Sequence, residues 1–218
     1  MKAASHHPYP GKLIVLEGPD GSGKTTLHAA LSAALADQGF EVLGVREPGG
    51  CELGEDLRLI LKGDRLSRGA VSCARAEALL FAAARAQLTE TVIVPALKRG
   101  AVVLQDRGVG SSLIYQGFAR GLGVQEVLAL NMFATAGILA DRVLCLTVNF
   151  RTASSRRQSR DGTPGDRIET ATNISGIASK YAQLHEFDPQ PVRYISADGN
   201  PEAVLTEALS NLTDLLKR

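Results

Sequence analysis

The most informative residues of this sequence form a glycine-rich run that ends in a lysine and a hydroxyl. The segment 18–25, Gly-Pro-Asp-Gly-Ser-Gly-Lys-Thr, fits the pattern G-x-x-x-x-G-K-[ST]. Glycines let successive backbone N–H groups turn around a phosphate, and the following helix points its positive end at the same anion. Lys24 can then reach the β- and γ-phosphates, and the Thr25 hydroxyl can ligate Mg²⁺. The residues expected to contact a bound triphosphate are Gly18, Gly21, Ser22, Gly23, Lys24, Thr25 and Thr26.

This phosphate-binding loop does not by itself distinguish kinases, GTPases, motors and synthetases. The guanine-reading motif N-K-x-D of GTPases is absent from the sequence, and motors and helicases are usually larger. The phosphoryl acceptor is therefore the open question.

The elements that must position this loop are apolar runs alternating with longer helical patterns. Strands are predicted at 13–16, 41–46, 101–105, 142–148 and 192–196. Helices are predicted at 24–38, 54–61, 72–98 and 201–216, the third of them bent near Pro95. Apolar strands separated by helices predict an α/β fold, a parallel sheet covered on both faces.

Polar residues follow several of these strands. The three segments are 46–58, 79–87 and 106–117. Ligands bind at the carboxyl edge of parallel sheets, so these segments are expected to border one crevice together with the phosphate loop.

Together with the phosphate loop, these segments resemble the thymidylate kinases of the bacterial type over about residues 12–200, most specifically at 80–97 and 106–117. The resemblance implies a P-loop NTPase three-layer sandwich with a five-stranded parallel sheet and a mobile lid. It also implies ATP with Mg²⁺ as phosphoryl donor, dTMP as acceptor, a homodimer and a cytoplasmic location.

The resemblance further implies which residues bind the base and the sugar. Phe81 matches the ring that stacks on thymine, although from its position alone a core role is favoured. Arg85 matches the arginine that hydrogen-bonds the base, and a solvated helix charge is the alternative. Ser112 and Gln116 match contacts to the base edge, and their spacing of one helical turn lets both face one ligand. Tyr115 matches the tyrosine set against the sugar.

The acceptor phosphate is expected among arginines, because their planar forks suit a phosphate monoester. By resemblance, Arg46, Arg58 and Arg107 surround it, and Asp20 lies near it. Ser111 completes the expected substrate-binding set.

Two further acids are assigned through the resemblance. Asp106 is the acid associated with Mg²⁺, acting through water. Glu47 is expected to hold Arg46 or a water in place.

Residues 151–167 are rich in arginine and nearly free of apolar residues, which predicts a mobile surface segment. The family carries its lid here, at about 151–169. The phosphate loop has Gly21 where part of the family has an arginine, so this chain resembles the class whose lid supplies it. Arg157 and Arg160 are the first candidates, and Arg156 follows. The expected catalytic residues are Lys24, Asp20, Arg107, Arg157 and Arg160.

The sequence departs from the family pattern after Arg107. Gly108 stands where an aromatic residue or histidine is usual, and Gly110 stands where an acid is common. Both glycines are expected to loosen the loop beside the acceptor, so the sequence leaves a kinase for dUMP or a 5-modified pyrimidine monophosphate open as an alternative. A nucleotide-binding regulator without catalysis is a second alternative.

Composition bounds the remaining possibilities. The chain has 24 basic and 23 acidic residues and a net charge of +1, which argues against bulk nucleic-acid binding. Three widely spaced cysteines predict buried free thiols, and no apolar run reaches the roughly 18 residues of a membrane span. One domain is predicted over 12–218, after a disordered leader at 1–11.

Overall fold

The computed structural model describes residues 7–62, 73–158 and 174–217. Five parallel strands form a sheet with the order β2-β3-β1-β4-β5. The strands are β1 (Lys12–Glu17), β2 (Val42–Arg46), β3 (Val102–Asp106), β4 (Arg142–Thr147) and β5 (Val192–Ser196). The five predicted strands are confirmed, with ends shifted by at most one residue.

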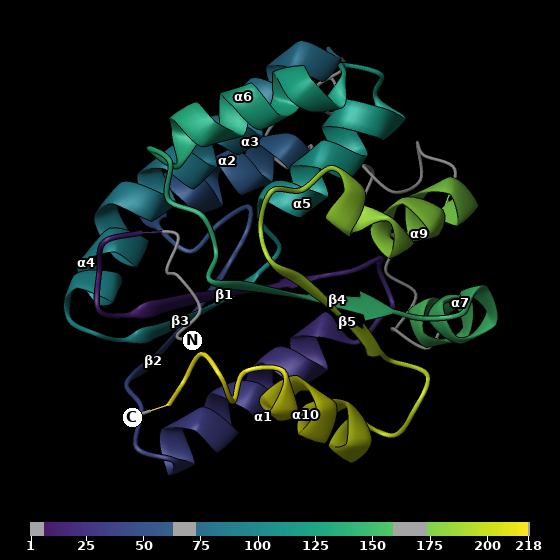
Figure 1. Ribbon diagram of the computed structural model, residues 1–218. Helices are drawn as coiled ribbons and strands as arrows, with labels where there is room; N and C mark the ends of the chain where they lie inside the picture. The colour runs from purple at the N-terminus through teal and green to yellow at the C-terminus, as the bar shows by residue number, and fades with distance from the viewer. Residues whose placement is uncertain (1–6, 63–72, 159–173, 218) are drawn as a thin grey trace.

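Helices cover both faces of the sheet and give three layers, as predicted (Figure 1). On one face lie α1 (Lys24–Asp37) and α10 (Pro201–Ser210). The other face carries α2 (Glu52–Lys62), α3 (Ala74–Leu88), α4 (Val94–Lys98), α5 (Val109–Ser112) and α6 (Val124–Ala134). The remaining described helices are α7 (Phe150–Gln158), α9 (Ile174–Ala182), the 3₁₀ turn η3 (Leu184–Glu186) and the π-helical segments η1 (Thr89–Ile93) and η2 (Leu113–Ala119).

The alternation of side chains along β1 divides the interior into two cores. Leu13 and Val15 pack beneath α3 and α4, whereas Ile14 and Leu16 pack against α1 and α10. All four are at most 5% exposed, so the central strand is buried on both faces.

The predicted helix over 72–98 is present as α3, η1 and α4 in succession. Its irregularity is the π-helical segment directly before Pro95, where the backbone accommodates the ring. By length and composition alone this 25-residue stretch could cross a membrane. It instead packs on the sheet and carries the buried charges of Glu77 and Arg85.

The amino-terminal segment differs from the predicted disordered leader where it is described. Residues 1–6 lie outside the described part, but His7 is only 7% exposed. Its Nε2 lies 2.9 Å from Oδ2 of buried Asp141, which also accepts the N–H of Leu13 at 2.8 Å. A buried carboxylate needs such partners, and His7 is one of them.

The three cysteines are free thiols, as predicted. Cys145 is buried and Cys51 is half-buried. Cys73 is exposed, contrary to prediction, because it precedes the first turn of α3 at the surface.

Candidate active site

The phosphate loop connects β1 to α1 at the carboxyl edge of the sheet. Gly23 caps α1 with a φ of 92°, a left-handed conformation that favours glycine. Lys24 is 6% exposed, and its Nζ donates to the carbonyl oxygens of Gly18 at 2.8 Å and Pro19 at 3.1 Å. The ammonium group therefore lies over the loop, where a bound phosphate would offer it stronger acceptors.

The hydroxyls of the loop differ in exposure. Thr25 and Thr26 are exposed on the first turn of α1. The buried Ser22 Oγ has no hydrogen-bond partner among the described residues.

Asp106 ends β3, directly beside Leu16 of β1 in the sheet register. Its Oδ1 is buried and has no hydrogen-bond partner among the described residues. Within that part of the chain no three His, Cys, Asp or Glu side chains form a metal-binding group. A cation held here would depend on oxygens of the bound nucleotide, and the donor set of Asp106 and Thr25 suits Mg²⁺, which favours few protein ligands.

Arg107 follows Asp106 with a φ of 68°, a left-handed conformation uncommon for residues other than glycine. Its guanidinium pairs with Asp20 of the phosphate loop. The same group donates to the hydroxyls of Tyr181 at 3.1 Å and Ser111 at 3.2 Å, and lies 5.7 Å from the ring centre of Tyr115. The structure thus brings Arg107 and the phosphate loop together, as predicted.

Glu17 connects the end of β1 to the loop that follows β3. Its side chain is fully buried. Oε1 accepts the backbone N–H groups of Gly108 and Ser111, both at 2.9 Å, and Oε2 accepts the Ser111 hydroxyl at 2.6 Å. Ser111 is thus held by Glu17 and Arg107.

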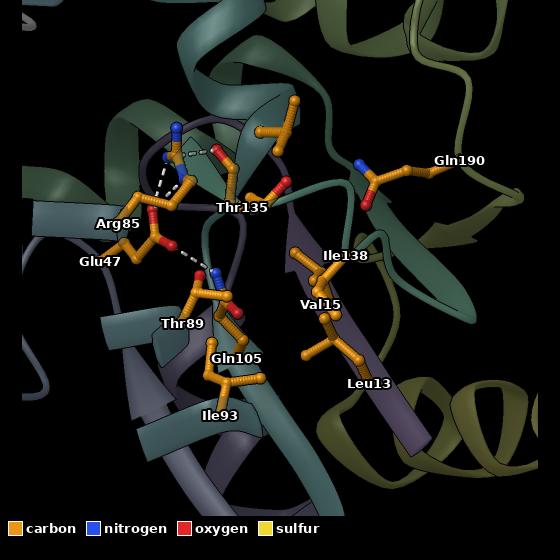
Figure 2. Close-up of a pocket in the computed structure, with 12 residues that line it drawn as sticks. Leu13, Val15, Glu47, Arg85, Thr89, Ile93, Gln105, Thr135, Ile138 and Gln190 are labelled. Atoms are coloured by element: carbon orange, nitrogen blue, oxygen red, sulfur yellow. Dashed lines mark hydrogen bonds and ion pairs between the residues drawn. The ribbon is translucent and has the colours of Figure 1, made fainter. Parts of the chain in front are cut away.

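Arg85 lies at the centre of a buried polar cluster (Figure 2). It is 3% exposed, and its Nε donates to Glu47 Oε2 at 2.8 Å. Nη1 donates to Ser112 Oγ at 3.0 Å and to Asn131 Oδ1, and Nη2 donates to the Gly108 carbonyl at 2.9 Å and to Glu47. Arg85 is thus no solvated helix charge.

Glu47 has a different partner from the one expected. It binds Arg85 and accepts Gln105 Nε2 at 2.7 Å, whereas Arg46 pairs with Glu55 at 2.9 Å. Burial raises the pKa of Glu47, although the charge of Arg85 opposes this effect. The strand alternation explains the difference, because Arg46 and Glu47 leave β2 on opposite sides.

Arg46 ends β2 and Arg58 lies on α2, so the two arginines flank the turn between these elements. The N–H of Gly50, with Arg46 beside it, lowers the pKa of Glu55. Arg58 Nη1 donates to the Pro48 carbonyl at 2.8 Å. The side chains of both arginines therefore contact the turn between β2 and α2 or the residues that cap it.

The expected base-binding residues lie on α3 and on the consecutive helical segments α5 and η2. Phe81 is half-buried on α3, one turn before Arg85. Ser112 contacts Arg85, and Gln116 contacts Glu77 of the same helix at 2.9 Å. Phe81 is absent from the buried clusters, so the core role favoured from its position is not what the structure shows.

The two glycines after Arg107 do not loosen the loop, contrary to prediction. A Cβ at Gly108 would lie 3.1 Å from Val15 Cγ1. A Cβ at Gly110 would lie 3.1 Å from both Glu17 Oε1 and Asp188 Oδ2. Neighbouring side chains already fill the space that larger residues would take, so the loop is closely packed.

Helix α7 lies against the phosphate loop. A Cβ at Gly21 would come within 2.5 Å of the Ala153 carbonyl, and one at Gly23 would lie 3.8 Å from Arg156 Nη1. Of the predicted lid arginines, the side chain of Arg157 and all of Arg160 lie outside the described part of the chain. Arg156 is thus the described lid arginine nearest the loop glycines.

A small cavity of about 20 Å³ lies behind Arg85, between Glu47, Gln105, Thr135 and Gln190 (Figure 2). This volume suits one water molecule. The cavity is too small for a nucleotide, and two of its polar lining residues, Glu47 and Gln105, belong to the support of Arg85.

Sequence reasoning missed the residues that hold the site from behind, namely Glu17, Glu77, Asn131 and Tyr181. One signal was available, because Glu17 is an acid that directly follows the apolar run Leu13–Leu16. The others stand in ordinary helical patterns.

Comparison with known proteins gives a consistent result. The family model described as thymidylate kinase matches residues 16–208. A thymidylate kinase of Rhizorhabdus wittichii is 39% identical over 212 residues, covering 95% of this chain and 99% of the relative. One from Thermoanaerobacter sp. is 39% identical, covering 95% and 98%, and one from Bacillus velezensis is 34% identical with the same coverage.

Asp188, beside Gly110, generates a prediction on pH and stability. Burial raises its pKa from 3.8 to about 6, despite hydrogen bonds from Gln190. Between these values the folded protein keeps a proton that the unfolded chain releases, so this group's contribution to stability falls as pH rises. The free energy of unfolding of Asp188→Asn should therefore exceed that of the parent protein by up to about 3 kcal/mol above pH 7. This difference should disappear near pH 4.

Urea unfolding from pH 4 to 8 measures this gap. Asp37→Asn, an exposed change on α1, is the control. A constant difference between Asp188→Asn and the parent across this range would contradict the prediction.

Proposed function

The chain belongs to the thymidylate kinase family and phosphorylates dTMP to dTDP with ATP as donor, and we propose that it does so by direct in-line transfer between the phosphate loop and Arg107. One observation carries this proposal: the Arg107 guanidinium pairs with Asp20 inside the phosphate loop. A donor phosphate bound at the phosphate loop and an acceptor phosphate bound at Arg107 would therefore lie next to each other. Positioning and charge neutralisation then supply most of the catalysis.

ATP is proposed to bind the loop residues Gly18, Gly21, Ser22, Gly23, Lys24, Thr25 and Thr26. Lys24 would exchange its two carbonyl acceptors for phosphate oxygens, which bind an ammonium group more strongly. Asp20, 3.7 Å from Lys24 Nζ, would keep both cations in position.

Mg²⁺ is proposed to accompany ATP, with Thr25 as direct ligand and Asp106 acting through water. The buried Asp106 Oδ1, which has no partner among the described residues, supports this assignment. The ion would neutralise phosphate charge during transfer.

The acceptor phosphate is proposed to bind Arg107, with Arg46 and Arg58 at its margin. Arg107 is preorganised by Ser111 and Tyr181 and by the ring of Tyr115. Preorganisation matters because a positioned charge needs no rearrangement as the transition state forms.

The thymine base is proposed to stack on Phe81 and to meet Arg85, Ser112 and Gln116 at its edge. Phe81 and Arg85 share one face of α3, since they are four residues apart. Glu47 supports Arg85, and Tyr115 would border the deoxyribose.

Lid arginines are proposed to contact the transferring phosphoryl group and to neutralise its negative charge. Arg156 is supported by its approach to Gly23. Arg157 and Arg160 remain candidates from the sequence.

The family's homodimer is proposed to form through α3 and α6. Phe133 is 87% exposed and Leu79 is 58% exposed, which is unusual for large apolar side chains. A cytoplasmic location without nucleic-acid or membrane partners completes the proposal.

A substrate panel tests the proposed function. ADP release with Mg²⁺-ATP should be fastest with dTMP, slower with dUMP and dCMP, and lost on Mg²⁺ removal.

Lys24→Met should lower kcat by roughly a hundredfold or more, because a preorganised charge near the phosphates disappears. Equal or better rates with dUMP would favour the alternative acceptor, and full function of Lys24→Met would favour the non-catalytic regulator.

Arg156→Gln should lower kcat by about a hundredfold while the KM for dTMP stays within twofold. This loss is smaller than that of a sole arginine finger, because neighbouring lid arginines remain. Arg151→Gln, an exposed change on the same helix, should retain parent activity. Equal effects of the two changes would argue against a specific role for Arg156.

Phe133→Asp should shift the protein from dimer to monomer in sedimentation velocity at micromolar concentration. A buried charge at the centre of an apolar interface is strongly unfavourable. The control is Leu53→Asp, a change of another exposed apolar side chain, on α2, which should leave the dimer intact. A monomeric parent protein, or an unchanged dimer in Phe133→Asp, would contradict the proposed interface.

A further inference from the structure

The side-chain amide of Gln116 has one end fixed by the protein. Gln116 is 2% exposed on η2, and its Nε2 donates to Glu77 Oε1 at 2.9 Å. Among the described residues, no donor contacts Gln116 Oε1. The amide therefore has one occupied end and one available end.

Glu77 is a buried carboxylate on the first turn of α3, 4% exposed. Arg120 binds it twice, from Nη2 to Oε2 at 2.9 Å and from Nε to Oε1 at 3.3 Å. The guanidinium compensates the buried negative charge, and a carboxylate paired in this way only accepts hydrogen bonds.

This chemistry determines which way the Gln116 amide points. Only the NH₂ end of an amide can donate to a carboxylate. The reverse orientation would set the amide oxygen against a carboxylate oxygen, which is repulsive. Glu77 thus requires Gln116 to present its carbonyl oxygen on the side away from Glu77.

The position of Glu77 relates this orientation to the base site. Glu77, Phe81 and Arg85 follow one another at intervals of four residues, so they share one face of α3. Ser112 and Gln116 have the same interval on α5 and η2. Arg85 contacts Ser112, and Glu77 contacts Gln116, so both pairs connect α3 to the consecutive helical segments α5 and η2.

We propose that Glu77 is a specificity-determining positioning residue, which fixes the Gln116 carbonyl as the acceptor for the N3–H of the pyrimidine. This inference rests on the proposed placement of the base beside Phe81. Thymine and uracil carry N3–H as a donor next to the C4 carbonyl. Cytosine instead has an acceptor at N3 and an amino donor at C4.

The site therefore discriminates at two adjacent atoms. Gln116 Oε1 accepts from N3–H, while the Ser112 hydroxyl, which accepts Arg85 Nη1 and keeps its own proton to donate, faces the C4 carbonyl. Cytosine would place acceptor against acceptor and donor against donor. Sites that match buried polar groups reject mismatched ligands strongly, because those groups lose their partners.

Glu77→Gln tests the proposal. In this variant Arg120 should donate to the new amide oxygen, so that the new NH₂ group faces Gln116. The Gln116 amide should then turn to accept from this NH₂ group, which directs its own NH₂ end away from residue 77. The ratio of kcat/KM for dTMP to that for dCMP should fall by roughly tenfold or more. The ratio of kcat/KM for dTMP to that for dUMP should stay within twofold of the parent value, because both bases carry N3–H and a C4 carbonyl. The KM for ATP should be unchanged.

The matched control is Asp214→Asn, the same chemical change in another carboxylate that accepts two hydrogen bonds from an arginine, Arg142. Its dTMP to dCMP ratio should equal that of the parent. An unchanged ratio in Glu77→Gln, or an equal fall in the control, would overturn the proposal. If Glu77→Gln does not fold, Glu77→Met makes the same comparison, since it also removes the carboxylate.

Gln116→Leu separates this inference from the proposed base site. If Gln116→Leu leaves the dTMP to dCMP ratio unchanged, the proposed placement of the base is wrong. If it lowers the ratio while Glu77→Gln does not, the role of Glu77 alone is overturned. If both lower it and the double variant matches Gln116→Leu, Glu77 acts through Gln116, whereas a merely structural role would add a separate loss.

Discussion

Glu17 is a fully buried carboxylate at the point where the central strand becomes the phosphate loop. Burying a charge is costly unless hydrogen bonds compensate it, and Gly108 and Ser111 supply them from the loop after β3. Their backbone is therefore fixed relative to the phosphate loop. The Gly108 carbonyl in turn accepts Arg85, and the Ser111 hydroxyl accepts Arg107. One buried acid thus connects the phosphate loop to Arg85 and Arg107.

The same principle recurs around the site, in that each buried ion is held by groups from other elements of the chain. Arg85 meets acceptors from the β2–α2 turn, the loop after β3, α5 and α6. Glu77, on α3, accepts hydrogen bonds from Gln116 on η2 and from Arg120, which directly follows η2. Such pairs are weak evidence for stability, but they fix geometry, and phosphoryl transfer depends on positioned charge. The site is therefore rigid where the base and acceptor phosphate are proposed to bind.

Departures from the family pattern are accommodated by packing. Gly108 and Gly110 follow Arg107 where larger residues are usual, yet Val15, Glu17 and Asp188 occupy the space beside them. A glycine loosens a loop through its wider backbone freedom, and side chains packed closely against the backbone limit that freedom. Substrate choice is accordingly better sought in Glu77 and Gln116, which face the pyrimidine edge in the proposed complex, than in these glycines.

The sequence by itself determined the five strands, their parallel arrangement and the phosphate loop. These features depend on local signals, such as the apolar run Leu13–Leu16 and the glycine spacing before Lys24, that neighbouring residues encode. The resemblance to a family added Arg85 and Arg107. Only the tertiary structure decided that Glu47 holds Arg85, that Tyr181 meets Glu17 164 residues away, and that Glu77 orients Gln116 across 39 residues. No local pattern specifies such partners, because a buried polar side chain bonds with whichever donor or acceptor the packing of distant elements brings beside it.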